Sequence, residues 1–313
     1  MVEARPPETA AAYVRDTLLT GRAGSRAHPD FPFGQYSDDT QFARELLLSI
    51  REAGQWSASE FAERVAALVR EGRDVGAGPG TRGAALLLAA GTPWQSSGAP
   101  PPYAGNGSAM RVAPLGALLA DEIPTLRRIA AEQSRITHLD SRCTAGSVAV
   151  ACATALAASD GFEPLAALAR IATWVGADDA AMGQAIAAIA DWLPLAPEDA
   201  AMRLRRAELD PEHVLLWRGI SAYVVPSVAW SLYAFLRSPD DYWTAVCTAI
   251  GVGGDTDTMA AMTGAMAGAR LGVGALPSGL LARLTDRGTW DAGQLEALAR
   301  DCAHLFTPSG PSC

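Results

Sequence analysis

The sequence contains no lysine, and this absence is the first of several that restrict what the chain can be. Its 25 basic residues are all arginine and face 34 acidic residues, which gives a net charge of -9 and an isoelectric point near 5.0. A broad surface for nucleic acid or anionic membrane needs an excess of basic residues, so neither partner is expected. Small molecules or proteins fit so acidic a chain better as substrates.

Metal-binding cysteine patterns and long hydrophobic runs are also missing. The five cysteines are odd in number and show no CxxC spacing, so the sequence predicts neither a zinc site nor a disulfide framework. Residues 1–18 carry charges throughout and lack the apolar segment of a secretory signal. The run of small apolar residues at 145–158 is too short for a membrane span of about 20 residues. We therefore expect a cytoplasmic protein in a reducing compartment, with no membrane partner.

Alternating strand patterns are nearly absent, whereas apolar residues recur at helical spacing almost everywhere. Phe42, Leu46 and Ile50 form one such series on one face of a predicted helix. Glycine and proline separate the helical segments from one another. The sequence therefore predicts an all-α fold, a single compact multi-helix domain over residues 1–313 with roughly a dozen helices.

Two stretches rich in glycine and proline are predicted loops. Residues 76–80 read Gly-Ala-Gly-Pro-Gly, but no lysine follows and no strand precedes them, so we interpret them as a turn and not as a phosphate-binding loop. Residues 91–105 form the longest candidate loop, and long loops in compact domains are often functional. The sequence contains no GxSxG nucleophile motif, so acyl-transfer hydrolysis finds no support.

Two acidic motifs near opposite ends of the chain carry the most chemical information. Residues 37–40 read Ser-Asp-Asp-Thr, and residues 255–258 read Asp-Thr-Asp-Thr after the glycine-rich entry 251–254. If the fold joins them, their carboxylates repel one another, and hard divalent cations that take oxygen ligands would offset that repulsion. The alternative is that each motif only caps a helix, because Ser, Asp and Thr are preferred there and the helix dipole favours acids.

Two further motifs lie between the acidic ones. Residues 105–111 read Gly-Asn-Gly-Ser-Ala-Met-Arg and lead into an apolar run with Pro114, which predicts a tight turn that opens a helix. Backbone N–H groups at such a turn can bind phosphate or ribose oxygens; the alternative is a purely structural turn. His138 precedes a helix of small residues, and it is either a site residue or a buried, hydrogen-bonded structural histidine.

Taken in order, these four motifs resemble a known enzyme family. GQYSDDTQ, GNGSAMRVAPLG, SRITHLDS and GVGGDTDTMAAMTGAMAGARLG, which run from Gly34 to Gly272, are similar to the ADP-ribosylglycohydrolase family. The resemblance implies an all-α fold with a central cleft that holds two divalent cations, Mg²⁺ or Mn²⁺. It also implies ADP-ribose or an ADP-ribosylated molecule as the substrate.

The resemblance assigns roles to individual residues. Asp38 and Asp39 would be catalytic, and the ions would neutralise the carboxylates, activate a water or orient the ribose hydroxyls. The implied metal ligands are Ser37, Asp38, Asp39, Asp255, Asp257 and Thr258. The implied ADP-ribose contacts are Gly105, Asn106, Gly107, Ser108, Met110 and His138.

Residues 1–33 depart from the family pattern. Many members begin with a GDAxG helix followed by a Glu that reaches the metal site, and this chain has no such motif. Asp16 is the nearest match to the motif, and Ala23 stands about where the Glu is expected. We expect hydrolysis of the glycosidic bond between ADP-ribose and an acceptor. The alternatives are a non-catalytic ADP-ribose-binding or structural member of the fold, and a hydrolase of another nucleoside-like glycoside.

Overall fold

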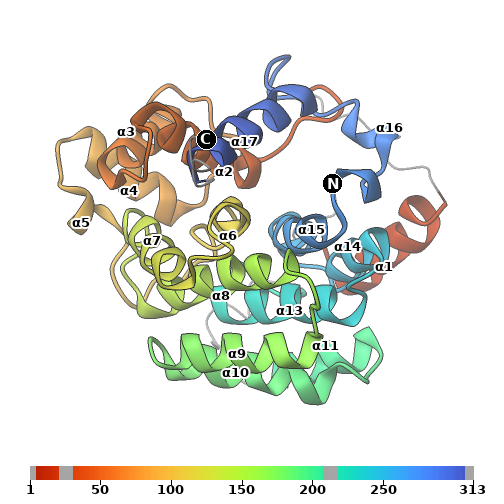
Figure 1. Cartoon of the computed structure of the whole chain (residues 1–313). Helices are drawn as coiled ribbons and strands as arrows, with labels where there is room; N and C mark the ends of the chain where they lie inside the picture. Colours follow the sequence, from red (N-terminus) through yellow and green to blue (C-terminus); the bar gives the residue numbers. More distant parts are fainter. Residues whose placement is uncertain (1–4, 21–30, 207–217, 307–313) are drawn as a thin grey trace, which may run out of the picture.

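The computed structural model describes residues 5–20, 31–206 and 218–306, and in these ranges the chain folds into helices joined by loops (Figure 1). The predicted series Phe42, Leu46 and Ile50 lies on one helix with all three side chains buried. Across the described ranges, extended segments pair only through isolated bridges. The predicted all-α class and single compact domain are confirmed.

The helices follow one another with little regular structure between them. In chain order they are α1 (Pro7–Tyr13), a π-helix (Val14–Leu18), α2 (Asp38–Ala53), α3 (Ala58–Arg70), α4 (Pro79–Ala89), α5 (Trp94–Ser97), α6 (Ala113–Leu118), α7 (Ile123–Arg135), α8 (Ser141–Ala157), α9 (Pro164–Gly176), α10 (Ala180–Trp192), α11 (Pro197–Arg206), α13 (Val224–Arg237), α14 (Tyr242–Gly251), α15 (Thr256–Leu271), a 3₁₀ turn (Val273–Ala275), α16 (Ser278–Leu281) and α17 (Ala292–Phe306).

Helix α8 lies at the centre of the domain, and its small residues explain why. Every residue from Cys143 to Ala157 is buried, as expected for a helix that is apolar on all sides. Helix α6 packs against it through Gly116, where a Cβ would collide with the carbonyl oxygen of Ala151. A Cβ on Gly146 would lie only 2.6 Å from Val224 of α13. Small side chains therefore let the neighbouring helices approach α8 closely.

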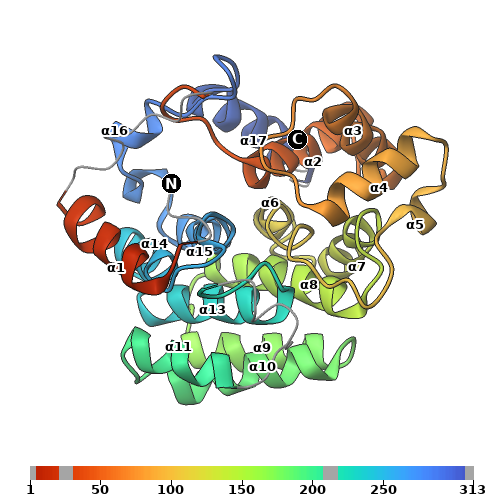
Figure 2. The same cartoon turned by 180° about the vertical axis from the view of Figure 1, so that it is seen from behind.

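The other helices form layers around this centre. Helices α9, α10 and α11 make one outer layer beneath α8 and α13, while α2, α3, α4 and α17 lie on the opposite side (Figures 1 and 2). Helix α15 packs against α8, α13 and α14, and it also contacts α2. The acidic motifs belong to α2 and α15, so the contact between these two helices positions the candidate site.

The N-terminal helices pack against α14. Asp16, the nearest match to the family's N-terminal motif, is exposed and bonds to Arg15 at 2.7 Å. Ala23, where the family's Glu is expected, lies outside the described residues. No helix in the described part of the chain is both long and apolar enough to span a bilayer.

Candidate functional site

The two acidic motifs stand at the N-termini of α2 and α15. Ser37 is the N-cap residue of α2 and Asp255 that of α15, yet neither side chain accepts a capping hydrogen bond from its helix. Asp140 and Asp179, the N-cap residues of α8 and α10, both do. Helix capping therefore does not account for the side chains of the acidic motifs, which turn to other partners.

The glycine-rich entry to α15 determines where Asp255 lies. Gly253 and Gly254 have φ values of 72° and 86°, a region that favours glycine. A Cβ on Gly254 would collide with the carbonyl oxygen of Ile220. That same oxygen accepts a hydrogen bond from the Asp255 N–H at 2.8 Å. The two glycines thus let the chain turn tightly against Ile220, which places Asp255 at the N-terminus of α15.

A cavity of about 300 Å³ lies where the two motifs meet. Most of the predicted site residues line it, and three do not: Ser37, Asp39 and Ser108. Those that line it are Asp38, Gly105, Asn106, Gly107, Met110, His138, Asp255, Asp257 and Thr258. The structure thus brings both acidic motifs, the Gly-Asn-Gly turn and the histidine to one place.

Asp39 lies just behind the cavity wall and is almost fully buried. The Ser37 hydroxyl donates to its Oδ2 at 2.6 Å, while its Oδ1 is buried without a partner among the described residues. Asp257 Oδ1 is likewise buried without a hydrogen-bond partner among the described residues. Burial and repulsion from Asp257 raise the pKa of Asp39 to about 7, against hydrogen bonds from Ser37 and Thr258. This carboxyl group is therefore poised between its charged and neutral forms near neutral pH.

Asp38 and Asp255 are shifted in the same direction. Burial, then repulsion from Asp39, Asp257 and Asp255, raises the pKa of Asp38 well above its ordinary value. Burial and repulsion from Asp257 also raise the pKa of Asp255. These shifts mean that Asp38, Asp39 and Asp255 cannot all be ionised without a strong free-energy cost.

The Gly-Asn-Gly turn contributes to this cluster directly. The Asn106 side-chain amide donates to Asp255 Oδ2 at 2.6 Å and to the Ser227 hydroxyl at 3.2 Å. Sequence analysis assigned Asn106 to ADP-ribose alone, so the structure adds a contact with the second acidic motif. Ser108 lies behind the cavity, where its hydroxyl accepts from Ser134 at 2.9 Å and Ser147 at 3.0 Å.

Several lining residues were not singled out from the sequence. The loop at 76–79, interpreted as a plain turn, lines the cavity beside Asp38, and so do Thr81 and Tyr103. A Cβ on Gly76 would come within 3.3 Å of Asp38 Oδ1. The available signal was the glycine-rich loop before Pro79, the first residue of α4. The loop lacks the lysine and the preceding strand of a phosphate-binding loop, so the sequence did not predict a ligand contact there.

The donor set fits a hard divalent cation in its chemistry. All the acidic-motif side chains offer oxygen atoms, and two of their buried carboxylate oxygens have no partner in the described part of the chain. Across the described residues, however, no three Asp, Glu, His or Cys side chains already converge as the ligands of one ion. The residues therefore match the cation by charge and atom type.

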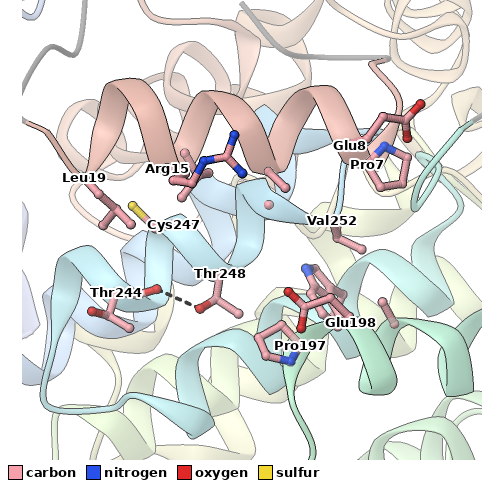
Figure 3. A pocket seen from close by; sticks show the side chains of 15 residues that line it. Pro7, Glu8, Arg15, Leu19, Pro197, Glu198, Thr244, Cys247, Thr248 and Val252 are labelled. Carbon is pink, nitrogen blue, oxygen red and sulfur yellow. Dashed lines mark hydrogen bonds between the residues drawn. The ribbon is translucent and has the colours of Figure 1, made fainter.

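A larger cavity, about 530 Å³, lies elsewhere, between α1, the π-helix, α11 and α14 (Figure 3). Its wall is mostly apolar, with Leu19 and Val252 at its ends and Glu8 and Glu198 on facing helices. The Arg15 guanidinium beside it is already bonded to Asp16. This cavity contains none of the predicted site residues, so size alone does not identify the site.

The fold and the site together define an all-α protein with an acidic cavity at the N-termini of α2 and α15. The family model for ADP-ribosylglycohydrolase matches residues 2–312, and the chain belongs to this family. The resemblance drawn from the four motifs is thereby confirmed. Membership makes the protein a glycosidase-type hydrolase.

Two curated proteins and one solved structure are similar to this chain. An uncharacterized protein of Archaeoglobus fulgidus is 27% identical over 259 residues, which cover 82% of this chain and 78% of that protein. ADP-ribosylhydrolase ARH3 of Gallus gallus is 29% identical over 188 residues, 55% of this chain and 51% of that protein. A solved ADP-ribosylglycohydrolase-related protein complex superposes with a TM-score of 0.67 at 27% identity, covering 91% of this chain and 87% of that one.

Proposed function

We propose that the protein is a metal-dependent hydrolase of the glycosidic bond between C1″ of ADP-ribose and an acceptor, a protein side chain or a small molecule. One observation carries the proposal. The N-termini of α2 and α15 bring Asp38, Asp255 and Asp257 to one cavity, with Asp39 next to Asp38 outside its lining. Among the described residues, Asp39 Oδ1 and Asp257 Oδ1 are buried without partners. Family membership supplies the reaction class, and this cluster supplies its chemistry.

Asp38 and Asp39 are the proposed catalytic residues. A water attacks C1″, the bond from C1″ to the acceptor breaks, and the acceptor departs with its bonding electron pair and a proton. Asp39 is proposed to orient the attacking water or to take a proton from it, because its Oδ1 is buried without a partner among the described residues. Asp38 lines the cavity and faces the positive charge that develops on the sugar ring.

Two divalent cations, Mg²⁺ or Mn²⁺, are proposed to be held by Ser37, Asp38, Asp39, Asp255, Asp257 and Thr258. When bound, such ions supply Lewis-acid stabilisation and neutralise the carboxylates. The chain's own residues hold the ribose end of the substrate at the turn formed by Gly105, Asn106, Gly107 and Met110, with His138 beside it. Ser108 supports the turn from behind.

The decisive experiment uses the full chain with Mg²⁺ or Mn²⁺ and measures release of free ADP-ribose from arginine-, serine- and nucleic-acid-linked substrates. We expect release from a restricted set of acceptors, lost on chelation and restored by metal. Asp160→Asn is the matched control, because Asp160 is an exposed carboxylate outside the cavity. No release from any linkage with both ions bound would contradict the proposal.

A second candidate function is ADP-ribose binding without turnover. Asp16 favours it, because this nearest match to the family's N-terminal motif is exposed, paired with Arg15 and absent from the cavity wall. A missing acid–base group can cost on the order of 10² to 10⁴ in rate. Tight calorimetric binding of ADP-ribose combined with no release in the linkage panel would favour this candidate over the enzyme.

A further inference from the structure

His138 presents one edge of its ring to the cavity. The side chain is buried, lines the cavity and stacks on Tyr103, with ring centroids 5.8 Å apart and an interplanar angle of 28°. Gly80, Gly105 and Gly107 surround the Nε2 edge. A Cβ on Gly80 would lie 3.1 Å from Nε2, and one on Gly105 would lie 3.4 Å from it. The three glycines therefore leave space beside Nε2.

The opposite ring nitrogen is held from behind by a buried chain of hydrogen bonds. Thr137 Oγ1 lies 2.8 Å from His138 Nδ1. Arg111 Nη2 donates to the same Oγ1 at 2.9 Å and to the Gln133 carbonyl at 2.9 Å. Arg111 Nε donates to Gln133 Oε1 at 2.8 Å. All four side chains are buried, so water does not compete for these bonds.

The direction of each bond follows from the chemistry of arginine. A guanidinium group only donates, so Thr137 Oγ1 accepts from Arg111 and keeps its own proton to give. Among the hydrogen bonds of the described residues, the acceptor for that proton is His138 Nδ1. An imidazole that accepts at Nδ1 carries its proton on Nε2.

The charges around the ring agree with this direction. Burial lowers the pKa of Arg111 to about 9, which still leaves the guanidinium charged at neutral pH. Burial and the Arg111 charge lower the pKa of His138 to about 3, while Asp140 opposes the shift. The imidazole is therefore neutral at physiological pH, and its single proton has a defined place.

We propose that Arg111 and Thr137 are positioning residues that hold His138 as the neutral Nε2–H tautomer, so that Nε2–H donates to an oxygen acceptor of the substrate. His138 then acts as a fixed, uncharged hydrogen-bond donor and not as an acid or base. The identity of the acceptor, a ribose or phosphate oxygen, rests on the proposed function. The tautomer itself does not.

The wild-type protein tests the tautomer without any ligand. Two-bond ¹H–¹⁵N correlation spectra of the ¹⁵N-labelled full chain report the protonation of each ring nitrogen, and His138→Gln identifies the His138 signals. We expect a pyridine-type Nδ1 and a pyrrole-type Nε2, unchanged between about pH 5 and pH 8. A proton on Nδ1, or a ring that becomes charged within this range, would overturn the proposal.

Thr137→Val and Thr137→Ser then test the chain of bonds. Val removes the hydroxyl at similar volume, whereas Ser keeps it. We expect Val to give mixed tautomers and ADP-ribose affinity about fivefold weaker, the loss of one neutral hydrogen bond, and Ser to retain both. An unchanged tautomer in a folded Val variant rejects the role of Thr137. If the wild type shows the expected tautomer but binds no ADP-ribose, the proposed function fails and the positioning role stands.

Discussion

Helix α2 contributes residues to two largely buried groups of charges that are built in opposite ways. At its N-terminus, Asp38 and Asp39 join Asp255 and Asp257 in a group of like charges, named here the carboxylate cluster. Further along the same helix, Arg44 and Glu45 join Arg64 and Asp286 in a group of opposite charges, named here the ion-pair network. Comparing the two groups distinguishes charges that stabilise the fold from charges whose proposed role is in the functional site.

In the ion-pair network each charge has an opposite partner within reach. Arg44 lies 2.7 Å from Asp286 and 2.9 Å from Glu45. Burial alone would raise the pKa of Asp286, but hydrogen bonds from Arg44, Gln41 and Gln35 hold it below its ordinary value. In the carboxylate cluster the pKa values of Asp38, Asp39 and Asp255 are raised instead. Two of the cluster's buried oxygens have no partner among the described residues. The ion-pair network is satisfied within the protein, whereas the carboxylate cluster is not, and this contrast supports the proposal that the cluster holds cations.

The largest expected effect is on activity. Asp39→Asn should lower the rate of ADP-ribose release by about 10² to 10⁴, because the amide neither takes a proton nor carries the charge. The metal-free protein should stay folded and become no less stable, since one repelling charge is removed. Steady-state kinetics and urea denaturation measure the two quantities. Activity close to wild type with metal present would show that the role given to Asp39 is wrong.

The matching change in the ion-pair network should act on stability. Asp286→Asn leaves the buried Arg44 with Glu45 as its remaining counter-charge, and the free energy of unfolding should fall by about 1.5 to 3 kcal/mol, the worth of a hydrogen bond to a charged group. Denaturant titration of this variant beside Asp39→Asn gives the direct contrast between the two groups. Should both variants lose stability equally, the distinction between the two groups would not hold.

The third prediction concerns pH. Asp39 has a folded-state pKa of about 7, above its unfolded value, so its stabilising contribution is present at low pH and is lost as pH rises through 7. The unfolding free energy of the metal-free protein should fall by about 3 kcal/mol between pH ~5 and pH ~8. Urea denaturation in a chelator measures this slope. Asp39→Asn is the control and should make the slope shallower, while Asp38 and Asp255, whose pKa values are also raised, supply the remainder. Mg²⁺ should offset the loss at high pH.

Much of the fold followed from the sequence because it depends on local periodicity. The apolar series on α2 follows the 3.6-residue repeat of a helix with one buried face. The run of small residues on α8 corresponds to a helix that is buried on all sides. Pro114 falls in the first turn of α6, as its fixed φ predicted. These features depend on residues close together in the sequence, so they could be predicted without knowing which distant segments contact one another.

The site was predictable only in part, because its geometry depends on contacts between distant segments. The acidic motifs stand out in the sequence, but the bond from Asn106 to Asp255 joins residues 149 positions apart. The loop at 76–79 reaches the cavity because the Asp38 N–H donates to the Val75 carbonyl and Gln41 accepts from the Val75 N–H. Neither contact leaves a pattern in the sequence. The roles of the predicted ligands and substrate contacts stay predictions.

The smallest expected effect tests how the carboxylate cluster is tuned. The Ser37 hydroxyl donates to Asp39 Oδ2 at 2.6 Å and lowers the pKa of Asp39 against burial and repulsion. Ser37→Ala removes this bond, whose worth of about 1.5 kcal/mol corresponds to a rise of about one in that pKa. In the metal-free protein, the stability loss should therefore continue to a pH about one unit higher before it levels off. Ser37→Thr keeps a hydroxyl on the same backbone position and should leave this upper limit near its wild-type value. The same upper limit in the Ala and Thr variants would show that the Ser37 hydroxyl does not set the pKa of Asp39.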